Sequence, residues 1–304
     1  MRLRDVDLGA GGPGASSLRL RAFGLVTIVL AVAACNLDGP ITTPAPTTPP
    51  STSSIAPTST LPPVIDCPGV GDFEEGRGIA DVAGEGSDSR TLGRISWDTS
   101  DQCETFHFDF ETAEGAPATV VPDIRVDHLD SFQVVRINVD VGDTVITDQL
   151  VETNLVDRLF VVRSLSGEMF VDLHLSAPAA VRAAVSSSPA RLSLDLRPGF
   201  VEFSGPAAIG DRVVLTSPVA GTEVDASVQL LGYARTFEAN VIAIATQGGE
   251  VVSEANATAA DYLETWGEYR LRLELPPGEV SVFVGEASPE DGNLEGLTVD
   301  FTVR

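Results

Sequence analysis

The amino-acid sequence predicts an all-β protein with two β-sandwich domains behind an N-terminal leader and a disordered stalk. From residue 91 onward, apolar and polar residues alternate with a period of two, and Gly, Pro or polar clusters separate the alternating runs. Alternation of this kind is typical of half-buried antiparallel strands. No long helical pattern interrupts these runs, and several short strands at this spacing indicate a sandwich or a barrel.

Composition argues against two kinds of partner, nucleic acids and anionic lipid headgroups. The chain has 304 residues with a formal net charge of -25, and all 19 basic residues are arginine. Nucleic-acid binding requires a basic surface, so we expect no nucleic-acid partner. Electrostatic docking to anionic lipid headgroups is excluded for the same reason. We interpret the charge as a means of solubility through self-repulsion.

Residues 1–34 have the pattern of a lipoprotein signal peptide. Arg19 and Arg21 precede an apolar run over residues 22–34, which is shorter than the roughly 20 residues that span a bilayer. The segment "VAAC", Val32 to Cys35, resembles a bacterial lipobox. The resemblance implies that Cys35 becomes the diacylglyceryl-modified first residue of the mature protein, held at the extracytoplasmic face of the cell membrane by chains such as palmitate. The alternative is an ordinary cleaved signal with an incidental cysteine.

The segment that follows is a predicted tether. Residues 36–64 are dominated by Pro, Thr and Ser, with scattered apolar residues. Such a segment buries too little apolar surface to offset its ordering entropy, so we expect a disordered linker biased toward polyproline II. Together with Cys35 it forms the region 35–64 that would lift a folded domain away from the membrane.

Two cysteines remain for the folded regions. Cys67 and Cys103 are an even pair in an oxidising compartment, and we predict a disulfide between them. It would close a loop of about 37 residues and contribute about 3 to 4 kcal/mol in chain-entropy terms. The alternative is a pair of metal ligands, which no CxxC motif or suitably spaced histidine supports.

The first folded region covers residues 65–200. The run "ETFHFDFE" places Phe106, Phe108 and Phe110 on one predicted strand face. The order of "TLGRISW", "CETFHFDFE", "PDIRVDHL", "LFVVRS", "MFVDLHLS" and "ARLSLDLRPG" resembles the AMIN-like domains of actinobacterial envelope lipoproteins over about residues 66–199. The resemblance implies a β-sandwich that localises a protein to the periplasm or cell wall, without amidase activity.

The second folded region covers residues 209–304, after a predicted linker "FSGPAAIGD" at 203–211. About seven alternating strands in about 95 residues fit an immunoglobulin-like sandwich. The region resembles the immunoglobulin-like domain of bacterial spore-germination lipoproteins, of the GerM-associated type. The matching positions are Pro218, Gly221, Val224, Gly232, Ala234, Phe237, Glu238, Trp266, Gly267, Ser288, Asp291 and Gly292. The resemblance implies no enzymatic role, and sporulation does not carry over to this chain.

No motif predicts catalysis. His107, His128 and His174 lie on predicted strands, and we expect them to be surface residues, since no GxSxG, HExxH or phosphate loop accompanies them. The acidic segments "DVAGEGSDS" and "SPEDGNLEG" lack EF-hand spacing, so we read them as turns rather than calcium sites. Trp266 either stacks on a sugar ring from an exposed position or closes the end of a sandwich core; the second is the commoner role.

These patterns predict a non-catalytic envelope lipoprotein that binds, localises or scaffolds at the interface between membrane and cell wall. Its expected partners are the membrane, through the lipid anchor, and a cell-wall component or envelope protein. We expect no catalytic residues, no cofactor and no metal. The alternatives are a solute receptor or sensor lipoprotein, or a wall hydrolase with an unrecognised site.

Overall fold

A computed structural model describes residues 67, 71–100, 103–129, 133–200 and 206–304. Apart from the short 3-10 helix η1 (Phe237–Ala239), all regular structure within these residues is β-strand, which confirms the predicted all-β class. None of the described segments forms a helix with the length and apolarity needed to cross a bilayer. The signal peptide and the stalk predicted for residues 1–64 lie outside the described residues.

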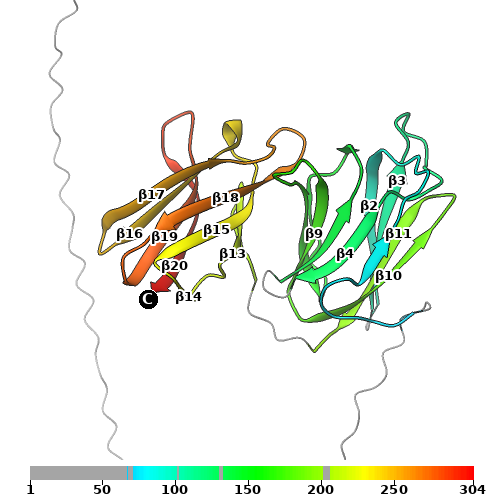
Figure 1. Cartoon of the computed structure of the whole chain (residues 1–304), viewed down its shortest axis with the longest axis horizontal. Coiled ribbons are helices and arrows are strands. Elements are labelled where there is room, and N and C mark those ends of the chain that lie inside the picture. The colour runs from blue at the N-terminus through cyan, green and yellow to red at the C-terminus, as the bar shows by residue number, and fades with distance from the viewer. Residues whose placement is uncertain (1–66, 68–70, 101–102, 130–132, 201–205) are drawn as a thin grey trace, which may run out of the picture. The chain divides into compact units, whose positions relative to one another are not determined.

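The first sandwich consists of two sheets (Figure 1). One has the order β1-β4-β5-β9-β8, with β7 also pairing with β8, and the other has the order β10-β11-β3-β2-β6. The strands are β1 (Ala80–Val82), β2 (Thr91–Thr99), β3 (Glu104–Glu111), β4 (Ile124–Leu129), β5 (Val134–Val139), β6 (Asp143–Thr144), β7 (Asp148–Leu150), β8 (Val156–Arg163), β9 (Met169–Leu175), β10 (Ala179–Ser186) and β11 (Arg191–Pro198).

The core of this sandwich follows from the alternation in the sequence. Phe106, Phe108 and Phe110 of β3 are buried to within 1% of full burial, and the residues between them are only half-buried. They pack with residues of the facing sheet, such as Val126 and Ile137, in one apolar cluster. The period-two pattern therefore predicted the face of β3 correctly.

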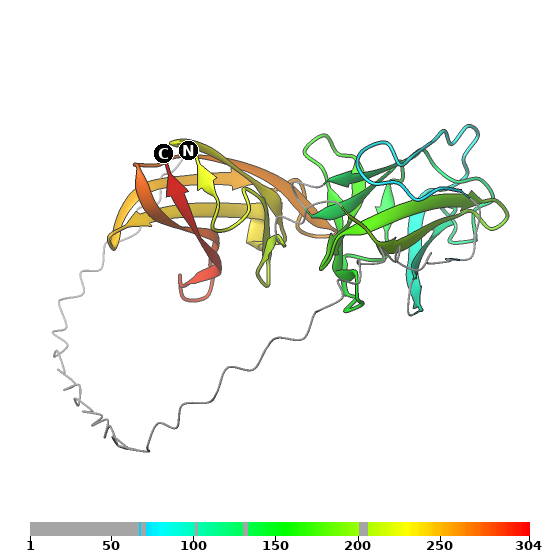
Figure 2. The ribbon, with the colours of Figure 1, turned by 90° about the horizontal axis from the view of Figure 1, so that it is seen from below.

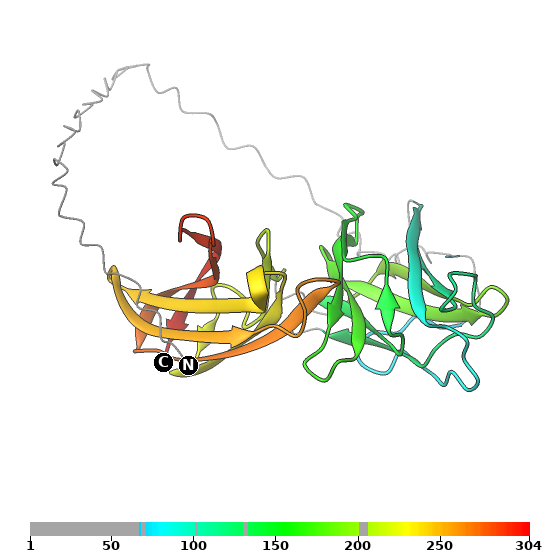
Figure 3. The same cartoon turned by 90° about the horizontal axis from the view of Figure 1, so that it is seen from above.

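The second sandwich also has two sheets, whose layers can be followed from below and from above (Figure 2, Figure 3). One has the order β18-β15-β13-β12 and the other β14-β20-β19-β16-β17. The strands are β12 (Ala208–Ile209), β13 (Val213–Ser217), β14 (Glu223–Val224), β15 (Ser227–Ala234), β16 (Asn240–Gln247), β17 (Glu250–Thr258), β18 (Trp266–Glu274), β19 (Gly278–Ala287) and β20 (Leu294–Val303). Two of the nine strands, β12 and β14, have only two residues each, which explains the excess over the predicted seven.

The C-terminal strand is an integral part of this sandwich. β20 lies between β14 and β19, and it pairs with β19 along its whole length. Val299, Phe301 and Val303 are buried in the second core, and Leu297 is half-buried against it. The alternating apolar residues of this strand therefore face the second core.

A strand pair joins the two sandwiches. β18 runs parallel to β8, with Trp266 opposite Val162 and Gly267 opposite Arg163. The segment 203–211 predicted as a linker is in part a strand, because Ala208 and Ile209 form β12 and pair with β13. The alternation in the sequence did not predict a sheet shared by the two sandwiches.

Candidate functional site

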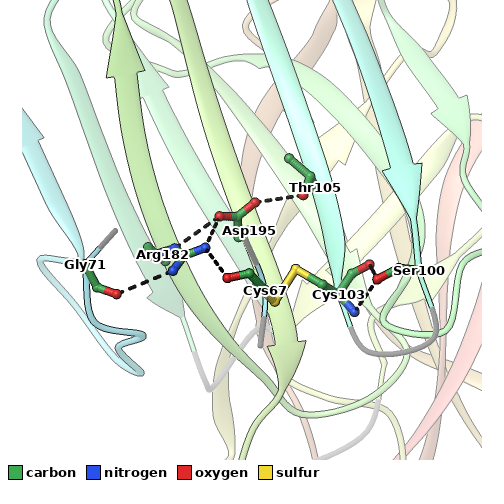
Figure 4. Close-up of a disulfide and its surroundings, with 7 residues drawn as sticks. All are labelled: Cys67, Gly71, Ser100, Cys103, Thr105, Arg182 and Asp195. Carbon is green, nitrogen blue, oxygen red and sulfur yellow. Dashed lines mark hydrogen bonds and ion pairs between the residues drawn. A yellow bond between two sulfur atoms is a disulfide. The ribbon is translucent and has the colours of Figure 1, made fainter. Parts of the chain in front are cut away.

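The predicted disulfide lies where the described chain begins (Figure 4). The structure joins Cys67 to Cys103, with 5.6 Å between their Cα atoms, and both residues are buried. Cys103 directly precedes β3, and its backbone N–H donates a hydrogen bond of 3.1 Å to Ser100 Oγ. The bond therefore attaches the entering chain to a strand inside the sheet rather than to an edge. Cys35, the predicted lipidation site, lies outside the described residues.

A buried arginine holds the same entering segment (Figure 4). Arg182 Nη2 donates to Asp195 Oδ2 at 2.6 Å and to the carbonyl oxygen of Cys67 at 3.3 Å. Thr105 Oγ1 donates to the other carboxylate oxygen of Asp195 at 2.7 Å. The guanidinium carbon also lies 4.6 Å from the ring centroid of Phe73. The disulfide, the Arg182–Asp195 ion pair and the cation–π contact with Phe73 together hold the start of the described chain against the first sandwich.

Both faces of β8 are buried where the two sandwiches meet. Leu159 and Val161 point into the first core, whereas Phe160 and Val162 belong to a separate apolar cluster. We call this cluster the junction cluster; its buried members are Phe160, Val162, Phe170, Ala207, Val214, Tyr233 and Trp266. Its members come from both sandwiches, so this interface is a third hydrophobic core.

Phe160 is the central ring of the junction cluster. Its ring centroid lies 5.1 Å from that of His174, 5.3 Å from that of Tyr233 and 4.8 Å from that of Trp266. Centroid separations of 4.5 to 7 Å with inclined planes are the favourable geometry for aromatic pairs.

An ion pair and a histidine lie beside this cluster. Arg136 donates Nε and Nη2 to the two carboxylate oxygens of Asp172 at 2.8 and 2.7 Å, and Asp172 is fully buried. The Arg136 guanidinium stacks 3.8 Å from the centroid of Phe170. His174 Nε2 and the Tyr233 hydroxyl are hydrogen bonded.

Burial determines the protonation of this group. It lowers the pKa of His174 to about 4 and raises the pKa of the Tyr233 hydroxyl well above its usual value. At neutral pH the imidazole is therefore uncharged and the phenol keeps its proton. In the Arg136–Asp172 pair each partner neutralises the charge of the other. The Arg158 guanidinium also lies beside the cluster, with its central carbon 5.9 Å from the centroid of Phe160. The arrangement suits a polar interface within one protein, because Asp172, His174 and Tyr233 are buried and Arg136 is only partly exposed.

The prediction of surface histidines is wrong for two of the three. His128 and His174 are each only 3% exposed. His174 lies on the outer face of β9, as the alternation indicated, but residues of the second sandwich cover that face. His107 is half-buried on β3 and is the only one of the three that keeps substantial exposure.

His107 has neighbours of the kinds used in nucleophilic catalysis. Its Nδ1 lies 2.9 Å from Ser193 Oγ, and its Nε2 lies 3.9 Å from a carboxylate oxygen of Asp98. The three residues lie on adjacent strands of one sheet, and the serine and the histidine are directly opposite each other in the β3–β11 register. The 3.9 Å separation is too long for a hydrogen bond that would orient the ring. The Asp98 side chain is also 88% exposed, so nothing excludes water from it. We interpret the set as cross-strand pairing on a sheet face.

Trp266 is buried rather than exposed. It is 3% exposed, and its indole Nε1 donates to Asp148 Oδ1 at 3.2 Å. The sugar-stacking alternative for Trp266 is therefore wrong, and the packing alternative is right. The tryptophan packs at the junction of two sandwiches, however, and not at the free end of one.

The acidic segments use their carboxylates in turns. Asp88 accepts hydrogen bonds from the backbone N–H groups of Thr119 and Val120, and these bonds hold its pKa below the usual range. The Asp291 carboxylate accepts from the Asn293 N–H at 3.0 Å, which likewise lowers its pKa. Among the described residues, no group of three or more His, Cys, Asp or Glu side chains is arranged to hold a metal ion.

Two open pockets lie on the first sandwich. One, of about 580 Å³, has four acidic residues in its lining, Asp81, Asp123, Asp140 and Glu168, together with Arg125. The other, of about 640 Å³, lies between the end of β2 and the loop that connects β7 to β8, and is lined in part by Trp97. Trp97 was not predicted to be a site residue. Its position in "RISW" at the end of a predicted strand was the available signal.

The geometry defines a two-sandwich β protein with buried polar joints and open surface pockets. Residues 212–293 match the family model of Gmad2, the immunoglobulin-like domain of bacterial spore germination, so a domain of this family is present there. No curated protein and no solved structure matches the chain. The AMIN-like resemblance of residues 66–199 stays a prediction.

Two glycines of the family pattern have a clear steric role. A Cβ at Gly232 would lie 1.9 Å from the carbonyl oxygen of Val214, and one at Gly267 would lie 2.2 Å from the backbone nitrogen of Asp261. Both positions require glycine because neighbouring backbone occupies the space of a side chain. At these two positions the pattern reflects the packing of the sandwich.

Proposed function

We propose that this chain is a non-catalytic lipoprotein of the bacterial cell envelope, anchored through Cys35 at the extracytoplasmic face of the membrane. It acts as a binding, localisation or scaffolding module. Its partners are the membrane, through the lipid, and a cell-wall component or envelope protein. Residues 66–199 supply the targeting role of an AMIN-like domain.

The Cys67–Cys103 disulfide is the observation that carries this proposal. Structural disulfides form and persist in oxidising compartments, which for a bacterium lie outside the cytoplasmic membrane. The bond also fixes the chain within three residues of the predicted stalk. A tethered domain needs a firm attachment at the point where its tether enters, and the buried Arg182 reinforces that attachment.

The second sandwich supports binding over catalysis. Its family is described by an immunoglobulin-like fold, and such folds present loops and sheet faces to partners. Fold alone does not establish function, so the proposal is to be tested directly on the chain.

The first test is fractionation of cells that express the full chain. We expect the wild-type protein in the membrane fraction, released by detergent but not by high salt. The Cys35→Ser variant should be found in the soluble fraction or remain unprocessed, whereas a Ser51→Ala variant in the same predicted stalk should behave as the wild type. Mass spectrometry that finds an unmodified mature N-terminus at another residue would contradict the anchor.

The second test concerns compartment and partners. Peptide mapping without reduction, after thiols are trapped during extraction, should recover Cys67 joined to Cys103; two free thiols would argue against an oxidising compartment. Cross-linked pull-down from envelope fractions should then identify the partner. Release of soluble fragments from purified cell wall by the protein would instead support the hydrolase alternative.

A further inference from the structure

The pocket at Trp97 has the size of a small-molecule site and a mainly polar lining. Its volume of about 640 Å³ falls within the roughly 300 to 1,000 Å³ that small-molecule sites occupy. It is lined by Trp97, Asp98, Thr99, Val151, Glu152, Thr153 and Asn154. One large aromatic ring thus lies among hydroxyl, amide and carboxylate groups. All these residues belong to the first sandwich.

The aromatic ring is held in place from behind. Trp97 of β2 lies directly opposite Phe106 of β3, and their rings stack with centroids 6.1 Å apart and planes inclined by 28°. Phe106 is fully buried, so it cannot move aside. Trp97 itself is half-buried, because it packs against the first core and also lines the pocket. A ring fixed in this way loses little conformational entropy when a ligand stacks on it.

The loop on the opposite side is equally fixed. Glu104, which is 2% exposed, accepts hydrogen bonds from the Thr153 hydroxyl at 2.6 Å and from the Leu155 N–H at 3.0 Å. The Val156 N–H in turn donates to Thr153 Oγ1 at 3.0 Å. A buried carboxylate therefore holds the loop against the end of the sheet that carries Trp97.

One residue of this loop has an unfavourable backbone conformation. Glu152 has φ +52°, in the left-handed region that glycine, asparagine or aspartate usually occupy. Such conformations cost about 1 to 3 kcal/mol and concentrate at ligand sites. Glu152 is also exposed and lines the pocket. This backbone position therefore places a carboxylate in the lining of the pocket.

Polar side chains of the pocket remain available to a ligand. Within the part of the chain that the structure describes, no hydrogen bond or ion pair involves the side chains of Thr99, Glu152 or Asn154. All three are exposed. They offer a hydroxyl, a carboxylate and an amide, which together both donate and accept hydrogen bonds.

We infer that this pocket is a carbohydrate-binding site for a neutral glycan, with Trp97 as the stacking platform. The C–H face of a pyranose ring is apolar and weakly positive, and it complements the negative face of an indole. Sugar hydroxyls match the mixed donors and acceptors of Thr99 and Asn154. The Asp98 and Glu152 carboxylates accept from hydroxyls and repel anionic polymers, as does the net charge of -25. The inference deepens the proposed binding role and rests on it.

A cationic peptide is the competing ligand, because carboxylates and an indole also attract ammonium groups. The neutral hydroxyl and amide groups favour a glycan over it. The two ligands differ in their response to salt. Binding through hydroxyl groups and ring stacking is nearly independent of ionic strength, whereas binding of a polycation to carboxylates weakens as salt rises.

Tryptophan fluorescence provides the assay, because the chain has only two tryptophans, and Trp266 is buried. The mature full chain is purified in a detergent without a sugar headgroup. It is titrated with a β-1,4-linked N-acetylglucosamine hexamer, with maltohexaose and with hexalysine. We expect at least one of the two oligosaccharides to change the emission with saturation below about 10 mM, unaltered between about 0.05 and 0.5 M NaCl.

Variants assign the signal to the pocket, and binding is measured by calorimetry so that loss of the fluorophore does not matter. Trp97→Ala should weaken binding about tenfold or more, and Trp97→Phe, which keeps a flat ring, should weaken it less. Asn154→Ala should weaken binding about threefold without lowering the melting temperature, since its side chain is exposed. Phe200→Ala, which removes an aromatic that is 86% exposed outside the pocket, should bind as the wild type.

Three results would overturn the inference. One is the absence of any change with either oligosaccharide up to about 10 mM. Another is unchanged affinity in both Trp97→Ala and Asn154→Ala. The third is salt-sensitive binding of hexalysine alone, which would identify a cationic peptide site. If the chain binds oligosaccharide but fails the Cys35 fractionation test, the glycan site is supported and the lipid anchor is contradicted. The two proposals can therefore fail separately.

Discussion

Substitution of Phe160 by alanine tests whether the two sandwiches pack against each other. The side chain is fully buried and contacts the rings of His174, Tyr233 and Trp266. Truncation of a buried Phe to Ala costs about 3 to 5 kcal/mol. Without the second sandwich, Phe160 would lie on the outer face of β8, where substitutions change stability by about 0.5 kcal/mol or less. The loss of unfolding free energy in Phe160→Ala is therefore several times larger if the two sandwiches pack against each other than if they do not.

The assay is urea unfolding of the full chain, followed by circular dichroism and tryptophan fluorescence. Val145→Ala serves as the matched control, because it also removes apolar side-chain atoms but its side chain is 69% exposed. We expect the Phe160→Ala midpoint to fall by the equivalent of about 3 kcal/mol or more, and the Val145→Ala midpoint to stay near the wild-type value. If the two variants shifted the midpoint equally little, the junction cluster would not exist in solution.

Three further predictions follow from described contacts. Burial lowers the folded-state pKa of His174 to about 4, so between this pH and about 6.5 the unfolded chain binds a proton that the folded chain does not bind, and the free energy of unfolding should fall by roughly 3 kcal/mol as pH drops from about 6.5 to 4. In His174→Gln the free energy of unfolding should depend less steeply on pH across this range. An equally steep dependence in the variant would contradict the assignment. Asp172→Ala should lower the free energy of unfolding by about 3 to 5 kcal/mol, because it leaves the Arg136 charge unpaired. Adding Arg136→Met should restore most of that loss, as measured in a double-mutant cycle. No recovery in the double mutant would mean that the two residues are not coupled. A chain of residues 209–304 should melt cooperatively, and the same chain ending at Glu295 should not. The shorter chain loses several core side chains, each of which contributes about 1.5 to 3 kcal/mol of burial energy. Equal melting temperatures of the two chains would show that β20 does not stabilise the sandwich.

The sequence predicted those parts of the fold that depend on one strand at a time. Phe106, Phe108 and Phe110 alternate with polar residues, so their buried face could be assigned without knowledge of the partner sheet. The same holds for Phe301 and Val303 of β20. The pairing of the disulfide could also be predicted, because only two cysteines remained once Cys35 was assigned to the lipid.

The junction was not predicted, because it depends on which surface covers an outer strand face. In "MFVDLHL" the residues opposite the core are Phe170, Asp172 and His174, and the two polar residues made this face resemble one exposed to solvent. The continuous apolar run "LFVV" of β8 was the missed signal, since strands buried on both faces lose their alternation. Trp97 was missed for a related reason. Its pocket is completed by a loop about fifty residues further along the chain. The alternation of residues in a strand does not predict which loop lies beside the end of that strand.

The position of the disulfide determines how the protein would carry mechanical load. If the chain is held at Cys35 and its folded part is pulled by a bound partner, tension enters the first sandwich at Cys67. The covalent bond passes that tension directly to Cys103 and so to β3, which is flanked on both sides by β2 and β11. Extraction of an internal strand must break two ladders together, in contrast to β1, a three-residue edge strand that could be peeled away one bond at a time. Reduction would leave the load on the hydrogen bonds that follow Cys67, first those with Arg182 and Val181 of the edge strand β10 and then those of β1. The oxidised protein should therefore withstand pulling forces that unravel the reduced one.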